Sequence, residues 1–103
     1  MTNHPFKIPK QWALSPQQEC VIGTLMDDAG HYTTAGQFCE ALYGEGFDKG
    51  PAPAKLRVLM QRCRAIVEVK STGKVAILIK RNSGWKITKK SRLIFLKVIA
   101  EDE

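Results

Sequence analysis

The pattern of apolar and polar positions predicts a first helix from Pro16 to about Asp28. Ser15 can cap this helix, and Pro16 suits the first helical position because its missing N–H would be unpaired there in any case. Gln18 completes a capping box with Ser15, and Gly30 is a typical helix-ending residue. The first helix is therefore marked at both ends.

A second helix is predicted behind a short extended bridge at 31–33. Thr34 and Gln37 repeat the capping-box spacing, and the apolar residues Phe38 and Leu42 follow at helical spacing. The second helix should end at about Tyr43. The glycines and prolines of 44–53 then mark a loop.

The segment 51–67 carries the most informative pattern of the chain. Its apolar residues are spaced four, three and four apart, which places them on one stripe of a third helix: Leu56, Met60, Cys63 and Val67. The remaining surface would present only cations and an amide, with no acid before Glu68: Lys55, Arg57, Gln61, Arg62 and Arg64. Solvated helices usually interleave Glu with Lys and Arg, because opposite charges four positions apart stabilise them. An anionic partner explains this face, and an ordinary solvated face is the alternative.

Two β-rich segments follow the third helix. Val75–Ile79 and Trp85–Ile87 predict a hairpin around a turn at Lys80–Ser83, with Gly84 suited to positive φ, and Val67–Val69 could begin a strand. Three helices followed by a hairpin is the order of a winged helix-turn-helix domain, an α+β fold. In that fold the third helix enters the major groove of DNA and the hairpin, or wing, reaches the neighbouring groove.

The two ends of the chain give weaker signals. Pro5 and Pro9 favour an extended arm or an edge strand over 1–13. The segment Ser91–Ala100 is too densely apolar for periodicity to choose between strand and helix, and we favour a helix capped by Thr88. The expected organisation is an arm at 1–13, a winged helix at 14–88 and a C-terminal extension at 89–103.

Charge is distributed unevenly along the 103 residues. The net charge is +6; residues 1–48 hold two bases and six acids, whereas 49–100 hold fourteen bases and one acid. A hydrophobic content of 44% and a charged content of 25% are typical of a soluble globular domain. The excess of positive charge in 49–100 favours nucleic acid or an anionic membrane surface as the partner.

Several other functions find no support in the sequence. No apolar stretch is long enough to span a bilayer, and the first residues contain no signal-peptide core. The three cysteines, Cys20, Cys39 and Cys63, lie far apart without a CxxC, so we expect buried free thiols in the cytoplasm rather than zinc or disulfides. His4 and His31 have no catalytic partner at usable spacing. We therefore expect neither an enzyme nor a cofactor.

Four segments, taken in order, resemble the OmpR/PhoB-type winged-helix domain of bacterial response regulators. They are LSPQQECVIGTLM at 14–26, TTAGQFCEALYG at 33–44, LRVLMQRCR at 56–64 and RNSGW at 81–85. The resemblance covers about 14–88. It implies base and phosphate contacts from the third helix, a wing arginine, Arg81, in the minor groove, and an RNA polymerase contact through the 44–53 loop. The helix contacts would fall on Lys55, Val58, Gln61, Arg62 and Arg64.

The chain also departs from the family pattern. Cys63 replaces a usual Leu, Asn82 replaces the first wing Gly, and Leu59 stands where a polar residue facing DNA or solvent is usual. Leu59 could contact a thymine methyl group or a protein partner. No receiver domain precedes the motif, and the family's N-terminal sheet cannot fit into fourteen residues. These departures suggest a stand-alone regulator of bacterial or phage type.

Two functions follow as expectations. The first is a sequence-preferring transcriptional regulator that binds double-stranded DNA without a cofactor. Its DNA-binding residues would be Lys55, Arg57, Val58, Gln61, Arg62, Arg64, Arg81, Ser83, Lys86 and Lys89. The alternative is a protein-interaction module that binds RNA polymerase or another regulator. The apolar residues of 93–99 would either pack on the chain's own core or form a homodimer.

Overall fold

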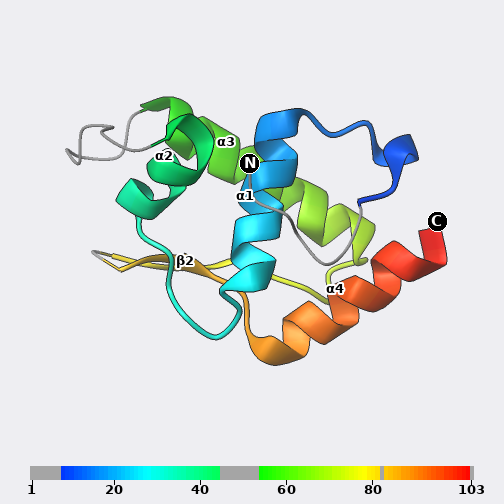
Figure 1. Cartoon of the computed structure of the whole chain (residues 1–103). Coiled ribbons are helices and arrows are strands. Elements are labelled where there is room, and N and C mark those ends of the chain that lie inside the picture. Colours follow the sequence, from blue (N-terminus) through cyan, green and yellow to red (C-terminus); the bar gives the residue numbers. More distant parts are fainter. Residues whose placement is uncertain (1–7, 45–53, 82, 103) are drawn as a thin grey trace.

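The protein is a small α+β domain, and its described residues form four α-helices and a two-stranded antiparallel sheet (Figure 1). The computed structural model describes residues 8–44, 54–81 and 83–102. Within these ranges the elements are a 3-10 turn Lys10–Trp12, α1 Pro16–Asp27, α2 Ala35–Tyr43, α3 Ala54–Lys70, β1 Leu78–Lys80, β2 Gly84–Lys86 and α4 Lys89–Asp102.

Both predicted capping boxes are present. Ser15 Oγ accepts a hydrogen bond from the Gln18 amide at 3.2 Å, and Gln18 Oε1 accepts one from the Ser15 amide at 2.9 Å. Thr34 and Gln37 make the same pair of bonds at the start of α2. Because each box satisfies N–H groups that the helix leaves unpaired, α1 and α2 begin where the sequence predicts.

The third helix is longer than predicted. α3 continues to Lys70, so the interpretation of Val67–Val69 as the start of a strand is wrong. Val67 is buried as the fourth residue of the predicted stripe. The chain leaves α3 through Gly73, which has a φ of +80° and whose amide bonds to the Glu68 carbonyl at 2.8 Å.

The hairpin has the predicted turn and shorter strands. Ile79 pairs with Trp85, and in this register Ile77 stands opposite Ile87. The second strand gives way at once to α4, which begins at Lys89, so the segment before β1 has no partner to pair with. Val75 and Ile77 are nevertheless buried. They fill the core from an extended segment without completing a ladder.

A third segment adjoins the sheet. Thr33 and Trp85 exchange two backbone hydrogen bonds, at 2.7 and 3.0 Å, and the Gly30 amide bonds to the Ile87 carbonyl at 2.8 Å. The extended bridge predicted between the first two helices is thereby confirmed. It places the chain from Gly30 to Thr33 along the side of β2 that is not paired with β1.

The C-terminal apolar segment is a helix of the domain itself. Thr88 Oγ1 accepts a hydrogen bond from the Ser91 amide at 3.0 Å, as expected for the start of α4. Phe95 and Ile99 are buried in the common core, whereas Leu93 is 66% exposed. Ile94, Leu96 and Val98 are partly buried against the same core. Figure 1 shows α4, coloured orange to red, at the opposite side of the domain from the hairpin turn.

The described part of the N-terminal arm contains no strand. Residues 10–12 form a 3-10 turn, which corrects the expectation of an edge strand there. The cause is Trp12, whose ring packs on Phe95 of α4 with centroids 5.8 Å apart. Burying the indole holds the chain against α4 instead of along the sheet.

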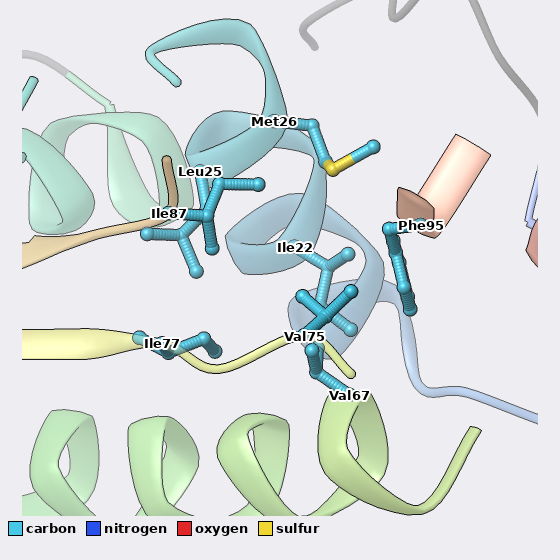
Figure 2. Close-up of a pocket in the computed structure, with 8 residues that line it drawn as sticks. All are labelled: Ile22, Leu25, Met26, Val67, Val75, Ile77, Ile87 and Phe95. Carbon is cyan, nitrogen blue, oxygen red and sulfur yellow. The ribbon is translucent and has the colours of Figure 1, made fainter. Parts of the chain in front are cut away.

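The core is continuous between α1, α3, the hairpin and α4. Eight apolar side chains surround a void of about 10 Å³ at its centre (Figure 2): Ile22, Leu25, Met26, Val67, Val75, Ile77, Ile87 and Phe95. A void of this size holds about one water molecule at most, and its lining is apolar. It is a packing gap and not a ligand site.

Candidate nucleic-acid interface

The buried stripe of α3 is the one that the sequence predicts. Leu56, Met60, Cys63 and Val67 all lie in the core, each at most 3% exposed. The predicted contact residues of the helix lie on its solvent side, and all are exposed: Lys55, Arg57, Val58, Gln61, Arg62 and Arg64. Among the described residues, no carboxylate forms an ion pair with these cations. Glu68, which is exposed one turn after Arg64, is the one acid of α3, so the face carries an excess of positive charge.

The exposed face of α3 is not purely cationic, which corrects the prediction of cations and an amide alone. Val58 is 47% exposed and Val69 is 71% exposed. At about 3.6 residues per turn, Val58, Ala65 and Val69 fall on one line that points away from the core. The bases lie in two rows beside this line, Arg57 with Arg64 on one side and Lys55 with Arg62 on the other. A narrow apolar crest thus runs between two basic rows.

Leu59 does not belong to this crest. Its side chain is half-buried and packs against the core, so it is unsuited to meeting a thymine methyl group or a partner. The neighbouring Val58 has the exposed apolar position instead. The predicted stripe already implies this difference, because at about 3.6 residues per turn Val58 lies opposite the stripe and Leu59 lies at its flank.

The hairpin turn carries the other predicted contacts. Arg81 is exposed, Ser83 is half-buried, and the Ser83 amide closes the turn on the Lys80 carbonyl at 3.0 Å. Gly84 has a φ of +107°, as predicted for this position. Asn82 lies outside the described residues. In Figure 1 the turn and the first turns of α3 lie toward the same end of the molecule.

Tyr32 is a site residue that the sequence did not reveal. Lys86 Nζ lies 4.5 Å from the centroid of its ring, and Lys80 Nζ lies 5.8 Å from it. Lys86 was predicted at the DNA, whereas Lys80 and Tyr32 were not. Only the pairing of Thr33 with Trp85 brings them together, and no local pattern indicates that pairing.

The basic residues at the start of α4 divide into two groups. Lys89 is exposed and lies beside Gly30, where a Cβ added to that glycine would stand 3.2 Å from Lys89 Cε. Arg92 instead donates from Nε to the Met26 carbonyl at 3.0 Å, near the C-terminal end of α1. Arg92 therefore differs from the predicted phosphate contacts Lys86 and Lys89. Its guanidinium satisfies a helix-end carbonyl within the protein.

The three cysteines are free. Cys39 and Cys63 are buried as predicted, whereas Cys20 is only half-buried. Burial raises the pKa of the Cys63 thiol to about 12 and also raises the pKa of the Cys39 thiol. In the described ranges no three or more His, Cys, Asp or Glu residues gather as metal ligands do. No helix within them has the length and apolarity to cross a membrane.

The loop predicted to contact RNA polymerase lies outside the described residues except for Gly44. Comparison with known proteins adds no assignment: no family model matches the chain, and no curated protein or solved structure is significantly similar to it. The case for a function therefore depends on the surface of α3 and the hairpin.

Proposed function

We propose that the domain is a winged helix of the OmpR/PhoB type that binds double-stranded DNA as a regulator of transcription. α3 would occupy the major groove, and the hairpin of β1 and β2 would serve as the wing in the adjacent minor groove. The element order, the segment at Thr33 beside the hairpin and the four family-like segments support this assignment. Such a regulator would act in the cytoplasm of a bacterial cell.

The observation that carries the proposal is the exposed face of α3. Two rows of arginine and lysine flank a crest of small side chains, and Glu68, near the end of the helix, is the one acid of α3. Small side chains on the crest let the helix approach the groove floor, while the flanking cations reach the phosphates on either side. Gln61 and Arg62 stand next to the crest. Their side chains suit adenine and guanine, respectively.

The other predicted contacts have separate roles in this arrangement. Arg81 at the exposed turn would enter the minor groove, and Ser83 would donate to a nearby phosphate. Lys55 and Lys89 would contact phosphates, as would Lys86 beside the wing. Phosphate contacts fix the register on the duplex, whereas the side chains next to the α3 crest would read its sequence.

The second candidate is a protein-interaction module. The exposed Val58 and Val69, together with Tyr43 at the end of α2, favour it because apolar side chains are suited to a protein partner. The two candidates differ in their response to salt. A phosphate-dominated complex weakens steeply with added salt, and an apolar interface does not.

Fluorescence anisotropy with a random-sequence duplex at several salt concentrations tests the proposal. We expect log K against log salt to fall with a slope of magnitude about 4 to 8, because each neutralised phosphate contributes about 0.9 to the slope. Arg62→Ala should lower the affinity. Lys97→Ala, which removes a positive charge from an exposed position of α4, is the matched control. Absence of binding at low salt, or a flat response to salt, would overturn the DNA-binding proposal.

A further inference from the structure

The outer face of the hairpin carries a second cluster of cations, formed by Tyr32, Lys80 and Lys86 and called here the Tyr32 site. Both lysine ammonium groups lie over the same tyrosine ring, at 4.5 and 5.8 Å from its centroid. The three side chains come from three chain segments. Their convergence is therefore a property of the fold and not of a local charge run.

Strand register explains how the site is built. Because Thr33 pairs with Trp85, Tyr32 stands opposite Lys86 on β2, and both side chains point away from the core. Lys80 pairs with Gly84, which has no side chain, so Lys80 can reach across β2 to the tyrosine. A Cβ at Gly84 would stand 2.0 Å from the Thr33 carbonyl oxygen. The glycine thus permits both the close approach of the segments and the reach of Lys80.

The charges of the site are unbalanced. In the described part of the chain, the side chains of Lys80 and Lys86 contact the Tyr32 ring, which carries no charge to balance theirs. Asp28 precedes this segment, but its carboxylate accepts a hydrogen bond from Thr33 Oγ1, which belongs to the opposite face of the strand. Lys89 adds a further cation beside Gly30. Two ammonium groups held near one ring repel each other, and a bound anion relieves that repulsion.

We propose that the Tyr32 site binds the sugar–phosphate backbone of DNA, beside the segment that α3 occupies. This inference rests on the DNA-binding function proposed above and adds a contact surface to it. A duplex backbone fits better than an unpaired base, because the ammonium groups already lie over the tyrosine ring on which a base would stack. The inner face of the hairpin packs Trp85 on Phe38 of α2. The site therefore extends the contact surface to the outer side of the wing.

Tyr32 acts in this site as a positioning residue. Its ring holds the two ammonium groups in place, and its own hydroxyl is not required for contact with phosphate. Removal of the ring should therefore weaken binding although no charge is lost. This effect distinguishes a built site from two lysines that bind phosphate independently.

The test compares salt slopes of binding to the random-sequence duplex. Lys80→Ala and Lys86→Ala should each lower affinity about three- to tenfold and reduce the slope by about one. Lys97→Ala removes the same charge from an exposed position of α4 and should change affinity less than about twofold. Tyr32→Leu keeps an apolar side chain and should weaken binding about threefold, whereas Tyr32→Phe should bind like the wild type. Thermal unfolding of each variant confirms that it is folded.

Three other outcomes would overturn part or all of this inference. If Lys80→Ala and Lys86→Ala bind like Lys97→Ala while Arg62→Ala binds weakly, the Tyr32 site and the phosphate contact of Lys86 are wrong, and DNA binding through α3 stands. If Tyr32→Leu binds like the wild type while the lysine variants weaken, the positioning role of Tyr32 is overturned. If the wild type binds no duplex at low salt, the proposed function fails and this inference fails with it.

Discussion

Trp12 and Asp102, separated by 90 positions, are joined by a hydrogen bond of 2.8 Å from indole Nε1 to carboxylate Oδ2. Gln11 Nε2 donates to the backbone carbonyl of the same aspartate. The Trp12 ring packs on Phe95, and Lys70 Nζ lies 5.3 Å from the ring centroid. The last turn of α4 is thereby held to the 3-10 turn at the other end of the described chain.

Replacing Asp102 tests this contact. Asp102→Ala should lower the free energy of unfolding by about 1 kcal/mol, because it leaves the Trp12 N–H without its partner. Removal of a negative charge from the helix C-terminus offsets part of this loss. Glu101→Ala removes the same charge from the exposed neighbouring position and is the control. Urea unfolding followed by tryptophan fluorescence measures both. Equal stability of the two variants would show that the Trp12 bond contributes nothing.

The burial of α4 predicts a sharp contrast along one helix. Phe95→Ala should lower the free energy of unfolding by about 3–5 kcal/mol, because the ring is 1% exposed in the centre of the core. Leu93→Ala, at an exposed position, should change it by less than about 0.5 kcal/mol. Light scattering of wild type and Leu93→Ala also tests the predicted homodimer, since Leu93 is the most exposed apolar side chain of 93–99. A small cost at Phe95 would contradict the packing of α4.

Gly84 and Gly73 offer a matched pair of substitutions. Both have positive φ, but a Cβ at Gly84 would meet the Thr33 carbonyl oxygen at 2.0 Å, whereas a Cβ at Gly73 would meet no atom within 4 Å. Gly73→Ala should therefore cost about 1–2 kcal/mol from backbone strain alone. Gly84→Ala should cost more than about 3 kcal/mol, because the Thr33 segment must also separate from β2. Chemical denaturation of both variants checks the order, and equal costs would rule out the steric explanation.

Local signals predicted much of this fold. The capping boxes at Ser15 and Thr34 and the four-residue stripe of α3 needed only neighbouring residues, and all three appear in the structure. Contacts between distant segments could not be predicted from local sequence patterns. The 3-10 turn at Trp12 depends on α4, and the short strands depend on where Thr88 caps that helix.

In the candidate site too, local patterns predicted some residues, and long-range pairing determines the others. Periodicity placed the bases of α3 on its solvent side, but the roles of Lys80 and Tyr32 follow from the pairing of Thr33 with Trp85. Arg92 also depends on a contact that local sequence does not reveal. It belongs to a basic run in the sequence, yet a contact with α1, 66 positions away, uses its guanidinium within the protein.

Arg62 and Arg92 should consequently respond in opposite ways. Arg62→Ala should weaken binding to a preferred duplex by about 1–3 kcal/mol and leave the unfolding free energy within about 0.5 kcal/mol of the wild type. Arg92→Ala should leave DNA affinity nearly unchanged and lower the unfolding free energy by about 1–3 kcal/mol, because the Met26 carbonyl loses a charged donor. Anisotropy and urea unfolding on both variants measure the two effects. A loss of DNA affinity at Arg92 as large as that at Arg62 would place Arg92 at the interface instead.

The buried thiol of Cys63 predicts how stability depends on alkaline pH. Burial raises its pKa from 9.0 to about 12, so above pH 9 the unfolded chain loses a proton that the folded protein keeps. The contribution of this group is complete below pH 9 and is lost progressively as the pH rises toward 12. Cys63→Ala should therefore be less stable at neutral pH, by about 1–2 kcal/mol from lost packing, but should lose less stability in alkali. Between pH 8 and pH 10 its deficit relative to the wild type should shrink by about 1.4 kcal/mol. Urea unfolding at the two pH values measures the deficit, with Cys20→Ala as the half-buried control, and a deficit that stays constant would show that the Cys63 thiol does not carry the alkaline loss.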